Sequence, residues 1–557
     1  MDNLATRIKT LIQETYGLDV LVRLERPDPK FGDYATNVAM QLAKPLGKSP
    51  REITEQIAGV LRQDDNITEV SVAGPGFINF RLSDSALISQ ISERPACPYS
   101  GMNIVFEYSC PNAFKELHTG HLYQTIFGDI ASNLMLVGGA KLTRTSFGGD
   151  VGLHVAKCLW GMREELGGEA PEKLSEIADN AFDRARWISQ CYVRGARAYE
   201  DDIDVKSTID QLNVTIYDFH KTDDHQSPLA QIYWTTRQWS FDYFRAFYEM
   251  IRVENQHYYP ESQTAPVGMK VIDEQLEKGN LKRSNGAIVY EGDESKHLHT
   301  RVFVTSKGLP TYETKDIGVI WLEKQDYNFD HRYLLTGNDQ KEYMRVVYAA
   351  AELFRPELAG TMTHLTNGTV RFADGKKMSS RLGNVSRAAD VIEAVRERVA
   401  DLVADEKLRE DVALGAVKYA FAKYKLGGDI NFDLEETVSL QGNSGPYLQY
   451  AHARARRILE NVKTEFTMPK ELFDEDRALV HKLGEYHEVM NVAVAHLEPH
   501  HICNYLFELA QEFNRYYEKN RVVGDKKEAH RASLVALYAD ILRAGLTVLG
   551  ISAPDKL

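Results

Sequence analysis

The sequence predicts a multidomain α/β protein in which a Rossmann-type parallel sheet with an insertion lies between an N-terminal α+β module and a C-terminal all-α bundle. Three observations lead to this fold class. Short apolar runs alternate with helical patterns in the middle of the chain, as in strand–helix–strand units. Two alternating runs flank a turn near residue 75, and apolar residues at helical spacing fill the last part. We expect domains at 1–95, 96–390 (with the insertion at about 160–300) and 391–557.

The N-terminal module should contain a strand pair. Residues 69–72 and 77–82 alternate between apolar and polar side chains, and the sequence Ala-Gly-Pro-Gly at 73–76 separates them. Pro95 and Pro98 then mark a linker.

The middle region should begin with a parallel strand–helix–strand unit. Residues 104–106 read as a strand, and apolar residues recur every four positions over 122–134 until Gly138 and Gly139 end the helix. A second strand follows at 142–146. In such sheets the ligand binds beyond the carboxyl ends of the strands.

The C-terminal region reads as helical. Leu414, Val417, Phe421 and Tyr424 step by 3, 4 and 3 residues, which places them on one face of an amphipathic helix. A helical bundle is the simplest architecture for such segments.

Composition narrows the class of protein. The chain has 557 residues and a formal net charge of −14, which on its own counts against a nucleic-acid binder unless its basic groups are clustered. The five cysteines form no CxxC pair, which argues for a reducing compartment and against a structural zinc site. No apolar stretch is long enough to span a bilayer and no export signal is visible, so we expect a cytoplasmic protein without membrane contact.

The most informative motif follows the first strand of the middle region. His118, Gly120 and His121 form an HxGH motif at a helix start, where exposed N–H groups and the helix dipole favour a phosphate. The alternative is a pair of surface or packing histidines. A zinc site is a weaker interpretation, because no third ligand stands at the usual spacing.

A second basic motif lies at 374–384. Its cations Lys376, Lys377 and Arg381 stand among hydroxyls and small residues, a composition suited to the charge of a departing phosphoryl group. Alone it reads as a solvated loop, but the two motifs in this order are far less expected by chance.

Together, HxGH and Lys-Met-Ser-Ser-Arg resemble the HIGH and KMSKS signatures of class I aminoacyl-tRNA synthetases. The wider sequence resembles the arginyl-tRNA synthetase family along essentially the whole chain, in the stretches 31–37, 74–79, 107–112, 311–316 and 444–454. The resemblance implies an enzyme that activates L-arginine with ATP and Mg²⁺ and transfers it to tRNA(Arg). We expect a monomer, although the sequence itself does not specify the oligomeric state. The alternative is a catalytically silent relative that binds tRNA or regulates. The retained HxGH motif favours the enzyme.

The resemblance also implies roles for the residues of both motifs. Catalytic roles fall to Lys115, His118, His121 and Lys377, and ATP binding to His118, Gly120, His121, Lys377, Met378, Ser379, Ser380 and Arg381. One position departs from the family pattern: Ser380 stands where the signature has a second lysine. The resemblance implies that Lys115 supplies the missing charge, with Arg381 as the competing candidate.

Arginine recognition requires anionic partners for a planar, permanently charged guanidinium. For that end of the substrate the resemblance implies Asp316, Glu261 and the Tyr312 hydroxyl, and for the α-amino and carboxylate end it implies Glu107, Asn112 and Gln340. The alternative for any one of these acids is a solvated surface charge.

Contacts with tRNA are expected in both outer domains. The expected residues are Phe77 and Asn79 in the N-terminal module, and Arg454, Arg457, Arg515 and Tyr516 in the bundle. Aromatic rings beside arginines suit unpaired bases, although packing within the domain or a solvated face is the alternative. The histidines at 496, 500 and 501 are interpreted as structural, so no protein-caged metal is expected.

Overall fold

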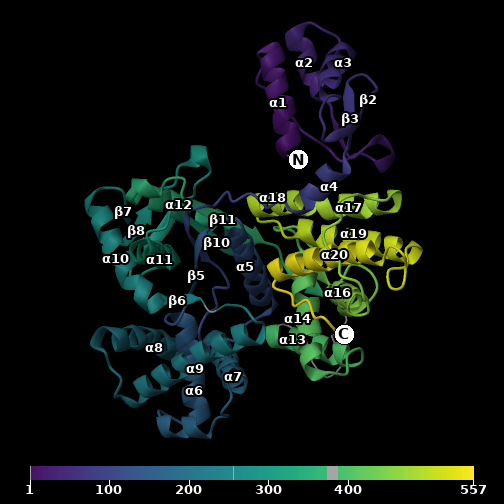
Figure 1. The fold of residues 1–557 in the computed structure, drawn as a ribbon. Coiled ribbons are helices and arrows are strands. Elements are labelled where there is room, and N and C mark those ends of the chain that lie inside the picture. The colour runs from purple at the N-terminus through teal and green to yellow at the C-terminus, as the bar shows by residue number, and fades with distance from the viewer. Residues whose placement is uncertain (1, 255, 373–386) are drawn as a thin grey trace.

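A computed structural model describes residues 2–254, 256–372 and 387–557. Figure 1 shows an N-terminal module above a helical bundle, with the central sheet and its helices beside the bundle. The central domain is built on a five-stranded parallel sheet in the order β11-β10-β4-β5-β6. These strands are β4 (Asn103–Glu107), β5 (Lys141–Gly148), β6 (His257–Pro260), β10 (His331–Gly337) and β11 (Met362–Asn367).

Both faces of this sheet are covered. In β4, Ile104 and Phe106 point into one hydrophobic core and Val105 into another, because successive strand residues face opposite sides. Helix α5 (Thr119–Val137) fills the first core, and three helices from the other side share the second: α10 (Glu261–Glu277), α11 (Tyr312–Tyr327) and α12 (Lys341–Phe354). The predicted strand–helix–strand unit and its fold class are confirmed.

The strand order creates a switch point between β4 and β10. From β4 the chain adds β5 and β6 on one side, whereas β10 and β11 are added on the other side. Helices that leave neighbouring strands here go to opposite faces, so the carboxyl ends of β4 and β10 border a natural crevice. A short 3-10 helix, η4 (Asn338–Gln340), follows β10 at this edge.

Helices inserted between β5 and β6 form a separate core (Figure 1). They are α6 (Leu153–Leu166), α7 (Ala181–Asp201), α8 (Ile203–Thr222) and α9 (Pro228–Met250), joined by the 3-10 helix η2 (Pro171–Glu176). Phe114 and Val151 from the central domain are buried in this core, which fixes the inserted helices against the sheet. A small antiparallel sheet follows α10 and consists of β7 (Lys282–Ser284), β8 (Ala287–Tyr290) and β9 (Arg301–Val304).

The N-terminal module contains an antiparallel sheet in the order β1-β3-β2. Its elements are α1 (Asp2–Tyr16), β1 (Tyr34–Thr36), α2 (Val38–Leu46), α3 (Pro50–Leu61), β2 (Ile67–Ala73), β3 (Phe77–Leu82) and α4 (Asp84–Ile91). Arg477 of the bundle bonds to Asp33 at 2.8 Å and to Asp84 at 3.0 Å, so charge pairs hold the module to the bundle.

The C-terminal region is helical with one short strand. Its helices are α13 (Ala388–Ala400), α14 (Glu406–Ala422), α15 (Leu434–Val438), α16 (Gly445–Glu460), α17 (Arg477–Gly484), α18 (Tyr486–His496), α19 (His500–Lys519) and α20 (Glu528–Val548). The strand β13 (Ile430–Phe432) pairs in parallel with β12 (Val370–Phe372), which ties the bundle to the central domain. Among the described helices, none combines the length and apolarity needed to cross a membrane.

Candidate active site

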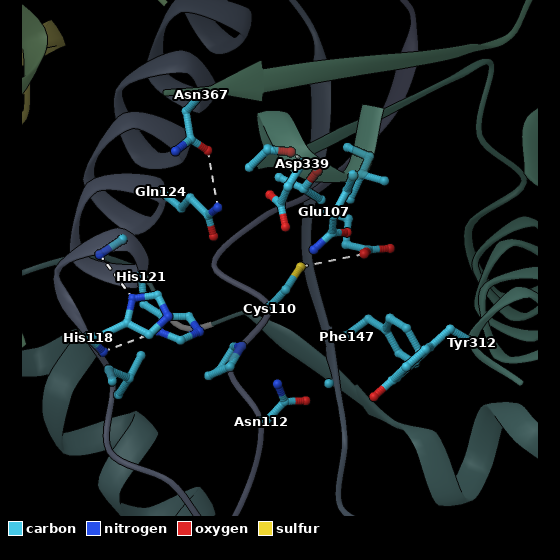
Figure 2. Close-up of a pocket in the computed structure, with 18 of the residues that line it drawn as sticks. Glu107, Cys110, Asn112, His118, His121, Gln124, Phe147, Tyr312, Asp339 and Asn367 are labelled. Carbon is cyan, nitrogen blue, oxygen red and sulfur yellow. Dashed lines mark hydrogen bonds between the residues drawn. The ribbon is translucent and has the colours of Figure 1, made fainter. Parts of the chain in front are cut away.

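A cavity of about 680 Å³ opens at the carboxyl ends of β4 and β10 (Figure 2). It collects the predicted residues of the described central domain, which are Glu107, Asn112, Lys115, His118, Gly120, His121, Glu261, Tyr312, Asp316 and Gln340. In Figure 2 the two histidines lie on one side of the cavity and Tyr312 on the opposite side. The cavity therefore has a phosphate-favouring end and a second, acidic end.

The basic motif falls in the part of the chain that the structure does not describe. Lys377, Met378, Ser379, Ser380 and Arg381 lie outside the described residues. The chain is described again from Arg387, and there it returns to the site, because the Ala388 N–H donates to the Leu117 carbonyl at 2.8 Å and Arg387 forms a β-bridge with His118.

The loop from β4 to α5 has an unusual backbone. Ser109, Cys110 and Phe114 adopt positive φ values of 71°, 47° and 65°, which cost non-glycine residues about 1 kcal/mol or more each and persist only where surrounding contacts enforce them. Here the Phe114 N–H donates to the Ser240 hydroxyl at 3.1 Å and the Tyr248 hydroxyl donates to the Ser109 hydroxyl at 3.1 Å. Both partners come from α9, so the inserted helices enforce the loop conformation.

The HxGH motif caps α5 with its own histidines. The His118 Nδ1 accepts the Gly120 N–H at 3.0 Å, and the His121 Nδ1 accepts the His118 N–H at 3.2 Å. Because each Nδ1 accepts a hydrogen bond, each neutral ring carries its proton on Nε2. A side chain at position 120 would bring a Cβ within 2.8 Å of the His118 ring, so only glycine allows this arrangement.

Both histidines favour the neutral form. Burial lowers the pKa of His118, and the nearby Lys115 lowers it further. Burial also lowers the pKa of His121 well below the usual range, and His118 and Lys115 add to that shift. Their ring centroids are 3.8 Å apart. The two rings thus form a pair of neutral N–H donors at a helix N-terminus, an arrangement suited to an anion.

The acidic end of the cavity contains an isolated carboxylate. Asp316 is 9% exposed, and the Tyr343 hydroxyl donates to its Oδ2. Within the described ranges no Lys, Arg or His lies within 4.0 Å of this carboxylate, and burial raises the pKa of Asp316 to about 7. A buried carboxylate without a cation is costly unless a ligand supplies one.

Glu261, by contrast, already has a cation. Its Oε2 lies 2.6 Å from the Lys315 Nζ, and both side chains are buried. The pair forms because α10 and α11 cross closely: a Cβ on Gly268 would lie 1.9 Å from the Thr314 carbonyl oxygen. Burial raises the pKa of Glu261, and Lys315 opposes that shift.

Glu107 belongs to a buried charge cluster below the cavity. Arg332 donates to Glu107 and, at 2.6 Å, to Glu323, so one guanidinium serves two carboxylates. Burial raises the pKa of Glu107, Arg332 lowers it and Glu323 raises it again. The Cys110 thiol donates to the second Glu107 oxygen at 3.5 Å.

The remaining predicted residues line the rim. The Asn112 Oδ1 accepts the Gly149 N–H at 2.8 Å, Tyr312 is 65% exposed at the start of α11, and Gln340 ends η4. Sequence reasoning missed several lining residues, namely Cys110, Gln124, Phe147, Thr336, Asp339, Tyr343, Asn367 and Thr369. Cys110 lies within the stretch 107–112 already singled out, whereas the others come from strand ends, loops and helices without a distinctive motif, so no local signal identifies them.

The predicted RNA-contacting residues differ in accessibility. Arg454 and Arg457 are exposed on α16, where the Arg454 guanidinium lies 5.2 Å from the Tyr517 ring centroid, and Arg515 is exposed beside Glu512. Tyr516 does not fit its prediction: it is 4% exposed and its hydroxyl donates to Asp476 at 3.0 Å, so no base can stack on its ring.

In the N-terminal module, Phe77 is half-buried at the start of β3 and Asn79 is buried.

One described group has the residue types of a metal site. Ligand atoms of Glu498, His500 and His501 lie within 4.8 Å of one another at the start of α19. The Lys425 Nζ is 3.3 Å from Glu498, and a helix N-terminus repels cations. These charges oppose metal binding there.

Comparison with known proteins gives matches along the chain. Three family models match: "Arginyl tRNA synthetase N terminal domain" at residues 2–82, "tRNA synthetases class I (R), catalytic domain" at 85–433 and "DALR anticodon binding domain" at 448–557. An arginine–tRNA ligase of Thermobifida fusca is 30% identical over 100% of this chain and 99% of its own length, and one of Shewanella loihica is 28% identical over 99% and 98%. The arginyl-tRNA synthetase structure of Thermus thermophilus superposes with a TM-score of 0.81 at 23% identity, covering 100% of this chain and 99% of that one.

Proposed function

The chain belongs to the arginyl-tRNA synthetase family of class I, and on that basis we propose how its residues carry out the family's reaction. Its activity is the ligation of arginine to tRNA. Arginine and ATP form arginyl-adenylate and pyrophosphate, and the arginyl group then passes to the 3′ end of tRNA(Arg).

The assignment of arginine as the substrate rests on Asp316. It is a buried carboxylate that faces the cavity without a described cation, whereas Glu261 is already paired with Lys315. The acidic end therefore has room for one positive charge, and a guanidinium forms the charge-assisted hydrogen bonds that a carboxylate accepts best. The exposed Tyr312 hydroxyl at the rim adds a further partner.

The opposite end of the substrate lies toward β4. Glu107, Asn112 and Gln340 border the cavity there and hold the α-amino and carboxylate groups of arginine. Burial raises the pKa of Glu107 to about 8 because Arg332 is shared with Glu323, and a substrate ammonium group beside it would favour its ionised form.

ATP binds over the HxGH motif. The neutral His118 and His121 donate from Nε2 to phosphate oxygens, and Gly120 leaves the helix N-terminus open to the triphosphate. Lys115 borders the same end of the cavity and supplies the charge that Ser380 lacks. Lys377, which lies outside the described residues, is assigned to the same phosphate groups.

Activation then needs little proton chemistry. The arginine carboxylate is ionised at neutral pH and attacks the α-phosphorus directly. Catalysis consists of positioning the two reactants and stabilising the negative charge that develops on the phosphate oxygens. Mg²⁺ enters with ATP, because the triphosphate supplies the oxygen ligands that this ion prefers.

The two outer domains bind tRNA(Arg). Arg454, Arg457 and Arg515 present exposed cations on the bundle, and Tyr517, stacked beside Arg454, replaces Tyr516 as the aromatic partner. Phe77, half-buried at the start of β3, contacts the tRNA from the N-terminal module, whereas the buried Asn79 supports the same strand in its pairing with β1. We propose that the protein acts as a monomer and, as a translation enzyme, in the cytoplasm.

Arginine-dependent ATP–pyrophosphate exchange, measured with and without tRNA(Arg), tests this function. We expect exchange with arginine and with no other proteinogenic amino acid, and arginine on the 3′ end of the tRNA. Absence of exchange for every amino acid, with tRNA present, would instead favour a catalytically silent tRNA-binding relative.

A further inference from the structure

Lys115 is half-buried at the edge of the cavity and has an unusual environment for a lysine. Its Nζ lies 4.3 Å from the ring centroid of Tyr192, which belongs to α7 of the inserted helices. In the part of the chain that the structure describes, no carboxylate lies within 4.0 Å of this ammonium group. The ammonium group thus lies over an aromatic ring, without a described carboxylate partner, at the edge of the cavity that the lysine lines.

Helix α7 holds the same segment at a second point. The Ser189 hydroxyl accepts the Glu116 N–H at 2.8 Å. Ser189 and Tyr192 are three residues apart and share a face of the helix. One face of α7 therefore fixes the backbone just before His118 and the side chain of Lys115 together.

The charges around Lys115 explain why a ring suits this position. His118, His121 and His154 all feel its positive charge, which contributes to their lowered pKa values. A carboxylate at the place of Tyr192 would neutralise the lysine and compete with phosphate. The ring attracts the ammonium group through its negative face, an interaction weaker than a buried ion pair, so a triphosphate can still draw on the charge.

We propose that Tyr192 is a positioning residue for activation: its ring holds the Lys115 ammonium at the phosphate end of the cavity. This rests on the proposed role of Lys115. A free lysine side chain samples many rotamers, and the ring limits them before ATP binds. The inserted helices thereby contribute directly to the charge that meets the triphosphate.

The test compares variants of the full-length protein in arginine-dependent ATP–pyrophosphate exchange with saturating tRNA. Tyr192→Leu removes the ring and Tyr192→Phe keeps it. Tyr199→Leu is the matched control, since Tyr199 lies on the same helix, is also half-buried, and holds Lys157 at 4.0 Å instead of Lys115. Thermal unfolding checks that all variants fold.

We expect Tyr192→Leu to lower kcat about two- to fivefold, the factor that corresponds to a partly exposed cation–π contact, with the KM for arginine unchanged. Tyr192→Phe should keep the wild-type kcat, and Tyr199→Leu should match wild type. In a Lys115→Ala background, Tyr192→Leu should have no further effect, because the side chain it positions is absent.

The outcomes separate this inference from the proposed function. If Lys115→Ala loses exchange but Tyr192→Leu retains the wild-type kcat, or if the two losses multiply in the double variant, the positioning role is wrong and the role of Lys115 stands. If Lys115→Ala itself shows near-normal exchange, the assigned role of Lys115 is wrong, and the inference falls with it. A Tyr192→Phe enzyme as slow as Tyr192→Leu would also overturn it.

Discussion

Lowering the pH should weaken arginine binding through Asp316. Burial raises the pKa of this carboxyl to about 7, so at pH 8 it is mostly ionised and at pH 6 mostly protonated. A guanidinium binds the ionised form, and the apparent dissociation constant is the intrinsic one divided by the ionised fraction. That fraction falls from about 0.9 to about 0.1 between pH 8 and pH 6, so the arginine KM should rise about tenfold.

The assay is exchange at saturating ATP and tRNA(Arg), with the arginine KM measured at several pH values between 6 and 8 at constant ionic strength. Burial lowers the pKa values of His118 and His121, which moves their titration away from that of Asp316. An arginine KM that stays constant from pH 8 to pH 6 would refute the reasoning. In Asp316→Asn the arginine KM should be high at every pH. If the KM of this variant still rose as the pH fell, the titrating group would be Glu107, whose pKa is also raised by burial.

Three further predictions concern separate parts of the chain. Lys315→Met leaves Glu261 buried without a partner and should lower the free energy of unfolding by about 3–5 kcal/mol in urea denaturation. Adding Glu261→Gln removes the unpaired charge and should restore most of this loss. Equal stabilities of the single and double variants would contradict the pairing. Gly120→Ala forces the His118 ring to move and should lower kcat about tenfold or more in exchange while leaving the melting temperature near wild type; an unchanged kcat would contradict the need for glycine. Arg454→Ala should weaken tRNA binding and reduce the slope of the logarithm of the binding constant against the logarithm of salt concentration by about one. Exchange at saturating tRNA should be unaffected. An unaltered slope would show that this residue does not contact the tRNA.

Local patterns predicted the core of the fold. The strand at 104–106, the helix over 122–134 and the strand at 142–146 became β4, α5 and β5, because each pattern reports one element and its buried face. The order of the five strands and the short strand β13 were not predictable, since they depend on pairing between distant segments.

The candidate site was predictable as a set of positions but not as a set of contacts. The motifs placed His118, His121 and Asp316, which the fold brings to one cavity. The contacts that set the chemistry of the site join segments distant in the sequence. Lys315 pairs with Glu261, which lies 54 residues before it, and Tyr192 of an inserted helix contacts Lys115.

The burial of one predicted RNA contact shows the same limit. Tyr516 and Tyr517 are equivalent in the sequence pattern, and only the rotation of α19 in the bundle decides which ring is buried. That rotation follows from the packing of several helices, which no single segment specifies.

Substrate discrimination tests the central claim most directly, because citrulline has nearly the shape of arginine but no positive charge. The measurement is the ratio of kcat/KM for arginine to that for citrulline in exchange, for wild type and for Asp316→Asn. We predict that the substitution lowers this ratio by about 100-fold, or about 3 kcal/mol, the scale of a buried charge pair. An unchanged ratio would contradict the assignment of Asp316 as the carboxylate that binds the guanidinium.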